Sequence, residues 1–472
     1  MNKPNLVYVF ADQLRWASVG FNGDSYARTP HLDRLAETCE NMENAFSGHP
    51  VCAPYRATLM TGKHTTGGTG MVINELRINP NHRTFANVLS ESGYATSYIG
   101  KWHMYAAQLG NHYDVKNSYI PPGENRLGFN EYFAAYNFHH EYYAPKAYYH
   151  LNSPEKIYCT GYEPDCQTDL AIERLRYHKK DGRPFALFLS IGTPHDPWTP
   201  KNVPPEYLKL FQNTDFPVPP NFKKHNDPHA DAWARFLPGK RKKINDWKRV
   251  YYAMVANLDD NVGRLYTFLE QEGLAENTIF VFTSDHGEMF GAQGRHAKNI
   301  FYDESIRVPF LIKWGNKLPC VRNQTPFGTV DIMPTLLAML GLAAPESAQG
   351  RDLSQSILTG QFTKNDCLLM GTGPTAIYGN GTEWRGLRTE RYTYAVYKAG
   401  KQAFLFDNAE DPYQTKNRIH DPACAALADR LRNEMHRQMD AIGDRFCWNS
   451  YYRRHWVKKR CIQITNGERN TK

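Results

Sequence analysis

The stretch Asn5–Phe10 (NLVYVF), followed directly by Ala11, Asp12 and Gln13, decides the fold class of this chain. Its nearly continuous β-branched and aromatic side chains are typical of a strand that is covered on both faces of a sheet. Four later runs have the same character, and each predicts another buried strand: Ala95–Ile99 (ATSYI), Phe185–Ser190 (FALFLS), Thr278–Thr283 (TIFVFT) and Val308–Lys313 (VPFLIK).

Helix-like segments lie between these strands, and several end at a glycine, the usual residue just beyond a helix C-terminus. They are Pro30–Ala36, Thr84–Ser92, Thr168–Lys179, Lys248–Glu272 and Asp331–Leu340. Strands that alternate with helices predict a doubly wound α/β fold, in which helices cover both faces of the sheet.

The pattern changes near the C-terminus. A chain of 472 residues exceeds the roughly 250–300 residues that one hydrophobic core usually holds. Beyond Gly360, a small antiparallel sheet is predicted by four short apolar runs: Cys367–Met370, Trp384–Thr389, Tyr392–Val396 and Ala403–Asp407. A helix is predicted after them, over Ala423–Ile442. We therefore expect a large domain over residues 1–360 and a smaller C-terminal α+β subdomain over residues 361–472.

The composition is that of a globular chain, with 41% hydrophobic residues, 22% charged residues and a mean hydropathy of −0.62. These values exclude a disordered, collagen-like or membrane-spanning chain. The formal net charge of +8 fits an anionic substrate. We expect no nucleic-acid partner, because no motif typical of nucleic-acid binding accompanies this charge.

The cysteines and the N-terminus bear on the compartment. Nine cysteines are scattered along the chain without a C-x-x-C pair, which argues against a zinc site or a dense disulfide framework. Cys159 and Cys166 could form a disulfide or remain two free thiols. The first apolar run is short and has no cleavage site after it, so it predicts a core strand and not a secretory signal. We expect a cytoplasmic protein as the chain is written, and a periplasmic or secreted one if a leader was removed.

Polar side chains follow four of the predicted strands at the point where each strand ends. They are Asp12 and Gln13 after the first strand, then Lys101 and His103, His195, and finally Asp285 and His286. In an open α/β sheet this edge is where ligands bind. A single Asp or His in such a place is usually a turn residue or a surface residue, but four coincident cases favour a functional site.

The ligand types in this set predict a divalent metal. Oxygen atoms from Asp12, Gln13 and Asp285 suit Ca²⁺ or Mg²⁺, and the imidazole of His286 also admits Mn²⁺. The remaining lysine and histidine side chains predict a cationic pocket for a tetrahedral oxyanion such as sulfate or phosphate.

Cys52 is the candidate nucleophile. It stands in the run Val51–Lys63 (VCAPYRATLMTGK), where a proline in the first turn places Cys52 at a helix N-terminus. The helix dipole favours developing negative charge there. Considered alone, a single cysteine is more often a small buried hydrophobic residue.

These residues together resemble a known family. C-A-P-Y-R-A-T-L-M-T-G-K resembles the signature of the type I sulfatases, formylglycine-dependent enzymes of the alkaline phosphatase superfamily. The other motifs follow in the family's order: G-K-W-H at Gly100–His103, T-P-H-D-P-W at Thr193–Trp198, T-S-D-H-G-E at Thr283–Glu288, and Lys298 before Y-D-E-S-I-R-V-P-F. The resemblance covers residues 4 to 415 and implies a large mixed, mostly parallel sheet sandwiched by helices.

The resemblance also implies roles for individual residues. Cys52 would be oxidised to formylglycine (3-oxoalanine) by a maturase and would also be a metal ligand, together with Asp12, Gln13, Asp285 and His286. One divalent metal is implied, with Ca²⁺ favoured and Mg²⁺ or Mn²⁺ as alternatives. Arg56 would hold the hydrated aldehyde. Lys101, Lys298 and His195 would bind sulfate oxygens and neutralise the leaving alkoxide. His103 would take the proton from the second hydroxyl.

One departure from the common family pattern leaves the substrate open. Many sulfatases carry Asp-Asp and Asp-Asn where this chain has Asp12-Gln13 and Asp285-His286. That variant is also similar to choline sulfatases and to phosphonate monoester hydrolases and phosphodiesterases. The pair Lys101 and His103 favours a sulfate ester.

We expect the substrate to be a small sulfated carbohydrate. The aromatic-rich insertion Phe129–Tyr149 could stack on sugar rings, with Trp198, Arg295 and Trp384 as further substrate-binding candidates at the rim. The alternative is that these aromatic residues form a small core of their own. A choline or aryl sulfatase and a phosphonate monoester hydrolase or phosphodiesterase are the other candidate functions.

Overall fold

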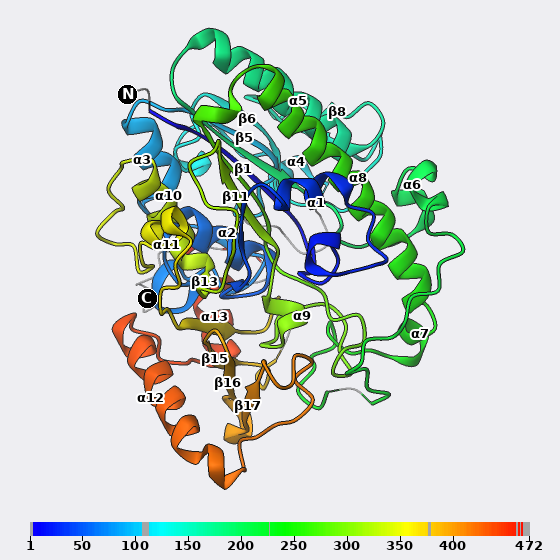
Figure 1. The fold of residues 1–472 in the computed structure, drawn as a ribbon, viewed down its shortest axis with the longest axis vertical. Helices are drawn as coiled ribbons and strands as arrows, with labels where there is room; N and C mark the ends of the chain where they lie inside the picture. The colour runs from blue at the N-terminus through cyan, green and yellow to red at the C-terminus, as the bar shows by residue number, and fades with distance from the viewer. Residues whose placement is uncertain are drawn as a thin grey trace.

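An eight-stranded sheet forms the centre of the computed structural model, which describes residues 3–105, 113–225, 227–375, 379–458, 461–462 and 464–465 (Figure 1). In order across the sheet its strands are β12 (Arg322–Asn323), β2 (Glu40–Met42), β11 (Phe310–Trp314), β10 (Thr278–Ser284), β1 (Asn5–Ala11), β9 (Phe185–Ile191), β5 (Ala95–Lys101) and β6 (Tyr132–Tyr136).

The sheet is mixed and mostly parallel, as expected. Strands β10, β1, β9, β5 and β6 run parallel to their neighbours in this order. Strand β11 runs antiparallel to both β10 and β2. All seven residues of β1 are buried, which confirms a strand covered on both faces.

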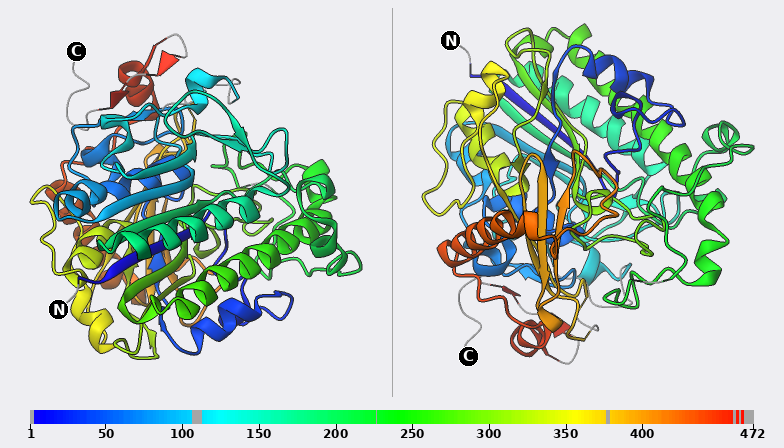
Figure 2. Two further views of the ribbon diagram at one scale, coloured as in Figure 1. Left: turned by 90° about the horizontal axis from the view of Figure 1, so that it is seen from above. Right: turned by 60° about the horizontal axis from the view of Figure 1, so that its bottom comes forward.

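Alternate side chains of β1 enter two separate cores, because successive residues of a strand point to opposite faces. Leu6, Tyr8 and Phe10 belong to one cluster, whereas Val7 and Val9 belong to the other. The first cluster includes residues of α2 (Cys52–Thr61), α3 (Phe85–Glu91), α10 (Thr329–Met339) and α11 (Ser354–Thr359). The second includes residues of α1 (Pro30–Ala36), α5 (Glu163–Asp181) and α8 (Ile244–Gln271), and Figure 2 shows α5 and α8 side by side.

The expected strands and helices are all present, and most of their bounds differ by one or two residues. The main differences are the starts of α5 and α8, which begin five and four residues earlier than expected, at Glu163 and Ile244. Pro164 lies in the first turn of α5, a position where proline needs no backbone N–H. The first turn of α5 contains Glu163, Pro164 and Asp165, so a hydrophobic pattern does not reveal it.

The C-terminal part contains the expected antiparallel sheet and helix. The sheet has the order β14 (Cys367–Gly371), β15 (Trp384–Arg388), β16 (Tyr392–Tyr397) and β17 (Ala403–Asp407), and α12 (Ala425–Ala441) packs against it (Figure 1). One core cluster joins this sheet to the preceding part of the chain, since Trp384 and Tyr397 pack there with Phe301. The division at residue 360 stays a prediction.

The remaining elements are short. They are β3 (Ala45–Phe46), β4 (Arg77–Ile78), β7 (Tyr148–Tyr149), β8 (Ile157–Tyr158), β13 (Phe327–Gly328), β18 (Val457–Lys458), β19 (Cys461–Ile462), β20 (Ile464–Thr465), α4 (Val115–Ser118), α6 (Pro205–Lys209), α7 (Pro238–Arg241), α9 (Asp303–Ile306) and α13 (Asn449–Trp456). Cys159 and Cys166 are free thiols that share a hydrogen bond. Within the described ranges, no helix has the length and apolar character needed to cross a bilayer.

Candidate active site

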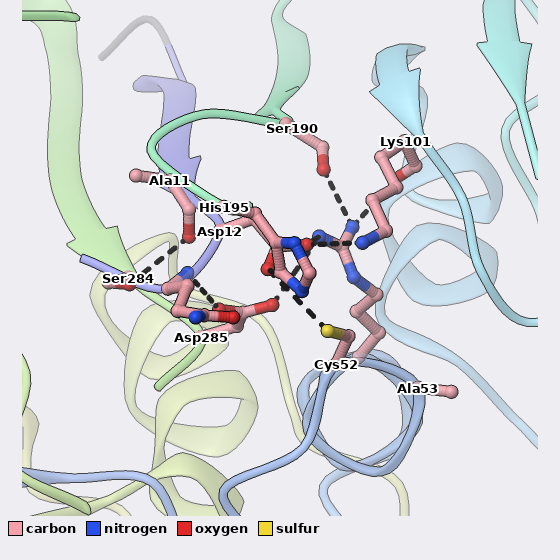
Figure 3. A network of polar contacts seen from close by, with 12 residues as sticks. Ala11, Asp12, Cys52, Ala53, Lys101, Ser190, His195, Ser284 and Asp285 are labelled. Atoms are coloured by element: carbon pink, nitrogen blue, oxygen red, sulfur yellow. Dashed lines mark hydrogen bonds and ion pairs between the residues drawn. The ribbon is translucent and has the colours of Figure 1, made fainter. Parts of the chain in front are cut away.

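The carboxyl ends of four neighbouring strands bring the predicted residues together. Asp12 follows β1, Lys101 ends β5, His195 follows β9 and Asp285 follows β10. Figure 3 shows these four side chains converging above the start of α2, where Cys52 stands. The structure thus brings these predicted residues together at one edge of the sheet, and their functional roles stay predictions.

Cys52 is the first residue of α2 and lies among the candidate metal ligands. Its Sγ is 3.5 Å from Asp12 Oδ1 and 3.2 Å from His286 Nε2. Burial, together with the charge of Asp12, raises the pKa of the Cys52 thiol to about 12. The unmodified side chain is therefore a neutral thiol at physiological pH and a poor nucleophile.

The ligand atoms of Asp12, Cys52, Asp285 and His286 all lie within 4.8 Å of one another, and all four residues are buried. Asp285 Oδ2 is buried and has no hydrogen-bond partner within the described part of the chain, and Arg56 NH2 lies 3.5 Å from it. Burial and the neighbouring Asp12 raise the pKa of Asp285 to about 7. An orphaned carboxylate oxygen beside a second carboxylate is the environment that a divalent cation would stabilise, so these residues fit a metal.

Two cations hold Asp12 in its ionised form. Lys101 Nζ donates to Asp12 Oδ2 at 2.6 Å, and Arg56 NH2 donates to the same oxygen at 3.2 Å. Burial alone would raise the pKa of Asp12, but the charges of Lys101 and Arg56 hold it well below its usual range. Arg56 also donates through NH1 to Ser190 Oγ at 2.6 Å, which ties α2 to the end of β9.

Gln13 faces the cationic side of the site. Its side chain Nε2 donates to Glu288 Oε2 at 2.8 Å, so its Oε1 is turned to the other side, where it accepts from Lys298. The backbone at Gln13 has φ of 69°, and its N–H donates to Asp285 Oδ1 at 2.9 Å. Gln13 Oε1 is thus presented towards the site, and its role as a metal ligand stays a prediction.

Lys298 and His195 form a pair. Lys298 Nζ lies 2.7 Å from His195 Nε2, while His195 Nδ1 lies 2.9 Å from the carbonyl oxygen of Asp196. Burial and the Lys298 ammonium hold the pKa of His195 well below its usual range. The neutral imidazole therefore carries its proton on Nδ1 and accepts from Lys298 through Nε2.

His103 lies close to the same region. It is buried, its backbone N–H donates to the Asn137 carbonyl at 2.8 Å, and its ring centroid is 4.3 Å from that of Phe138. Its assignment as a catalytic base stays a prediction.

The prediction that Trp198, Arg295 and Trp384 lie at the rim of the site is wrong, because their side chains are buried. Trp198 packs against Trp247 and Phe290, and its indole N–H donates to the Pro194 carbonyl at 2.8 Å. Arg295 is paired with Asp227 at 2.8 Å. Trp384 belongs to the core cluster between the two sheets and donates to the Asn299 carbonyl at 3.0 Å.

The aromatic residues of the insertion are mostly buried, but several of them join the main cores and do not form a separate small one. Phe129 and Phe133 belong to the cluster that contains Trp102, and Tyr142 belongs to the cluster on the other face of the sheet. These buried rings offer no open face to a sugar.

The sequence interpretation did not predict three contacts with the catalytic groups, although two of the residues lie in the Phe129–Tyr149 insertion that it proposed for sugar stacking. Phe138 and His140 follow β6, the edge strand, and Trp233 comes from the long excursion between β9 and α8. The segment Asn137–His140 (NFHH) repeats the pattern of polar residues after an apolar strand, so this signal could have identified it. Trp233 has no such local signal.

Comparison with known proteins agrees with this geometry. The family model described as Sulfatase matches residues 4–342, and the one described as N-sulphoglucosamine sulphohydrolase, C-terminal, matches residues 291–441. The chain is 36% identical to the ulvan-active sulfatase of Formosa agariphila, over 95% of this chain and 84% of that protein. It is 27% identical to the N-acetylglucosamine-6-O-sulfatase of Bacteroides thetaiotaomicron, over 74% of this chain and 70% of that protein.

A solved structure shares the fold. It holds its substrate, D-glucosamine-2-N,6-O-disulfate, and it superposes with a TM-score of 0.80 at 22% identity, covering 94% of this chain and 99% of that one. The matched family model spans most of the chain, and the site residues converge as its signature implies. The chain therefore belongs to the sulfatase family of the alkaline phosphatase superfamily and is a sulfuric ester hydrolase.

Proposed function

We propose that this sulfatase removes sulfate from a small sulfated carbohydrate, with formylglycine derived from Cys52 as its nucleophile. It would use one divalent cation, for which Ca²⁺ is the first candidate. The observation that carries the proposal is the position of Cys52, which begins a helix inside a buried pocket of two carboxylates and several cations. The similarity to the ulvan-active and N-acetylglucosamine-6-O sulfatases supports the carbohydrate substrate.

The metal would be held by Asp12, Asp285 and His286, with residue 52 as a further ligand and Gln13 Oε1 within the same region. A bound divalent cation supplies Lewis-acid chemistry, because it polarises an oxygen and lowers the pKa of a hydroxyl. Formylglycine supplies a hydrated aldehyde, whose hydroxyl oxygen takes the place of the Cys52 sulfur seen here.

The cationic side chains would bind the sulfate oxygens. Lys101 is fully buried and reaches Asp12 from the end of β5, and Lys298 donates to Gln13 Oε1. Ammonium groups in a buried pocket of low dielectric constant stabilise negative charge more strongly than they do in bulk solvent.

Proton transfer to the departing alkoxide would begin at Lys298. Because His195 is neutral and accepts from Lys298 through Nε2, the lysine ammonium is the proton-bearing member of the pair. Lys298 can therefore protonate the leaving oxygen directly or through His195. His103 would hold the proton released at residue 52, the role that the family signature implies.

The test is sulfate release measured by ion chromatography. The protein is co-expressed with a formylglycine-generating maturase, supplied with Ca²⁺, and given sulfated mono- and disaccharides, choline sulfate, an aryl sulfate and a phosphonate monoester. The expected result is that the wild type releases sulfate from a sulfated sugar and that Cys52→Ala does not. Release from choline sulfate alone, or hydrolysis of the phosphonate alone, would contradict the carbohydrate substrate.

A further inference from the structure

The exposure of one catalytic side chain, His195, indicates where the substrate reaches the site. His195 retains 8% side-chain exposure, whereas the side chains of Asp12, Lys101 and Asp285 retain none. Only a sulfate group needs to enter such a pocket, so the rest of the substrate must stay outside it. The group that leaves with the bridging oxygen therefore lies next to His195.

His140 stands against His195 at this opening. The two imidazole rings stack with centroids 4.1 Å apart and planes 3° from parallel. Phe138 contacts the edge of His140 at 4.4 Å and also packs on His103 at 4.3 Å. His140 is half-buried, and its Nδ1 is a buried atom without a hydrogen-bond partner among the described residues. It is thus a polar aromatic side chain, held in place by its neighbours and with unused hydrogen-bonding capacity.

Trp233 lies next to Lys298, the other member of the proton-transfer pair. Lys298 Nζ is 5.0 Å from the Trp233 ring centroid and 2.7 Å from His195 Nε2. The indole is half-buried. The backbone of Trp233 is held by Asp231, whose Oδ1 accepts its N–H at 2.9 Å, and by Lys240, which donates to its carbonyl at 3.3 Å. These two hydrogen bonds position the backbone that carries the ring, although it belongs to a long excursion.

These two side chains suit a saccharide. A pyranose has a face of C–H groups that packs on an aromatic ring, where the negative π-face attracts the weakly positive hydrogens. It also has hydroxyls at its edge that can hydrogen-bond to an imidazole. We propose that Trp233 and His140 form the walls of the subsite for the sulfated sugar ring, with Trp233 providing the stacking face and His140 a hydrogen bond to a hydroxyl. This assignment rests on the proposed carbohydrate substrate.

A different role would be purely internal, with Trp233 holding Lys298 by a cation–π contact and touching no substrate. Inhibition by inorganic sulfate distinguishes the two roles, because sulfate occupies the pocket but has no sugar ring. A subsite residue affects the KM of the saccharide and leaves the inhibition constant of sulfate unchanged. A residue that positions Lys298 affects both.

The experiment uses the matured Ca²⁺-loaded enzyme and the O-sulfated monosaccharide that the wild type hydrolyses fastest. Trp233→Ala should raise KM about tenfold, as expected for loss of about 1.4 kcal/mol of stacking, with kcat and the sulfate inhibition constant within about twofold of wild type. His140→Ala should raise KM similarly. His140→Phe keeps a ring that can stack on His195 but lacks the hydrogen bond, so it should not restore the KM of wild type. Trp448→Ala is the matched control, because Lys398 Nζ lies 4.9 Å from that ring in the C-terminal part.

The outcomes are distinct. An unchanged KM in Trp233→Ala and His140→Ala, or a sulfate inhibition constant that rises as much as KM, would overturn the subsite while leaving the carbohydrate function intact. If the wild type releases sulfate from no saccharide, the proposed function itself fails and the subsite fails with it.

Discussion

Cys52 is the residue whose chemistry depends most on modification. Because the pKa of its thiol is raised to about 12 by burial and by Asp12, the unmodified residue carries almost no thiolate at neutral pH. We expect protein made without a maturase to release sulfate no faster than Cys52→Ala, although it folds normally. Intact-mass measurement establishes the state of residue 52, and ion chromatography measures the release. Full activity in protein whose mass shows an unmodified cysteine would contradict this.

Lys298 gives a second prediction at the residue scale. As the proton-bearing partner of His195, it should matter most when the leaving alkoxide is strongly basic. We expect Lys298→Ala to lower kcat by about 10²–10⁴-fold on a sugar sulfate, and by clearly less on 4-nitrophenyl sulfate. Lys313→Ala, at an exposed side chain that donates to the Thr38 carbonyl, is the control. Equal losses on both substrates would show that Lys298 acts by binding sulfate alone.

At the scale of single elements, β5 depends on a glycine just before Lys101. Gly100 has φ of +100°, and a Cβ there would lie 2.1 Å from the carbonyl oxygen of Ser190 in β9. We expect Gly100→Ala to separate the two strands at the site, with loss of activity and a lower Tm. Gly93→Ala is the matched control, since Gly93 has φ of +86° and a Cβ added there would meet no atom within 4 Å; it should cost only about 1–2 kcal/mol. Similar Tm losses in both variants would contradict the steric argument.

The N-terminal turn of α5 makes stability depend on pH. Burial raises the pKa of Glu163 to about 8, and its Oε1 accepts from the Tyr136 hydroxyl at 2.7 Å. A carboxyl whose folded-state pKa is raised contributes stability at low pH that is lost as pH rises through that pKa, by up to about 1.4 kcal/mol per pH unit. Glu163→Gln keeps the acceptor and removes the titration, so its Tm should fall less than that of wild type between about pH 5 and pH 8. Parallel Tm profiles would contradict the prediction.

At the scale of the whole molecule, one cluster couples the C-terminal sheet to the catalytic part. Trp384 is fully buried between Phe301 and Gly371, and its indole donates to the carbonyl of Asn299, next to Lys298. We expect Trp384→Ala to lower the free energy of unfolding by about 3–5 kcal/mol and to reduce kcat as well. Trp448→Ala, at a side chain 38% exposed, should change it by less than about 0.5 kcal/mol. Unchanged activity in a destabilised Trp384→Ala would show that the sheet supports the fold alone.

The residues at the strand ends could be predicted because the signal is local. Strand runs such as Asn5–Phe10 and Thr278–Thr283 have a composition that only a doubly covered strand explains, and the polar residues directly after them must lie at one edge. Asp12 and Asp285 follow from this reasoning. The sulfatase signature then identified Cys52 and Arg56 within the same site.

The rim could not be predicted in this way. Trp198, Trp384 and Trp233 are equally aromatic in the sequence, yet the first two are buried with their indole N–H groups paired, and the third stands half-buried over Lys298. Which ring is covered depends on segments distant in sequence that pack over it. By itself the sequence therefore determined the sheet and the polar residues that gather at one of its edges, because those depend on the order of residues along each strand. Only the tertiary structure decided which side chains surround the entrance, because burial is set by long-range packing.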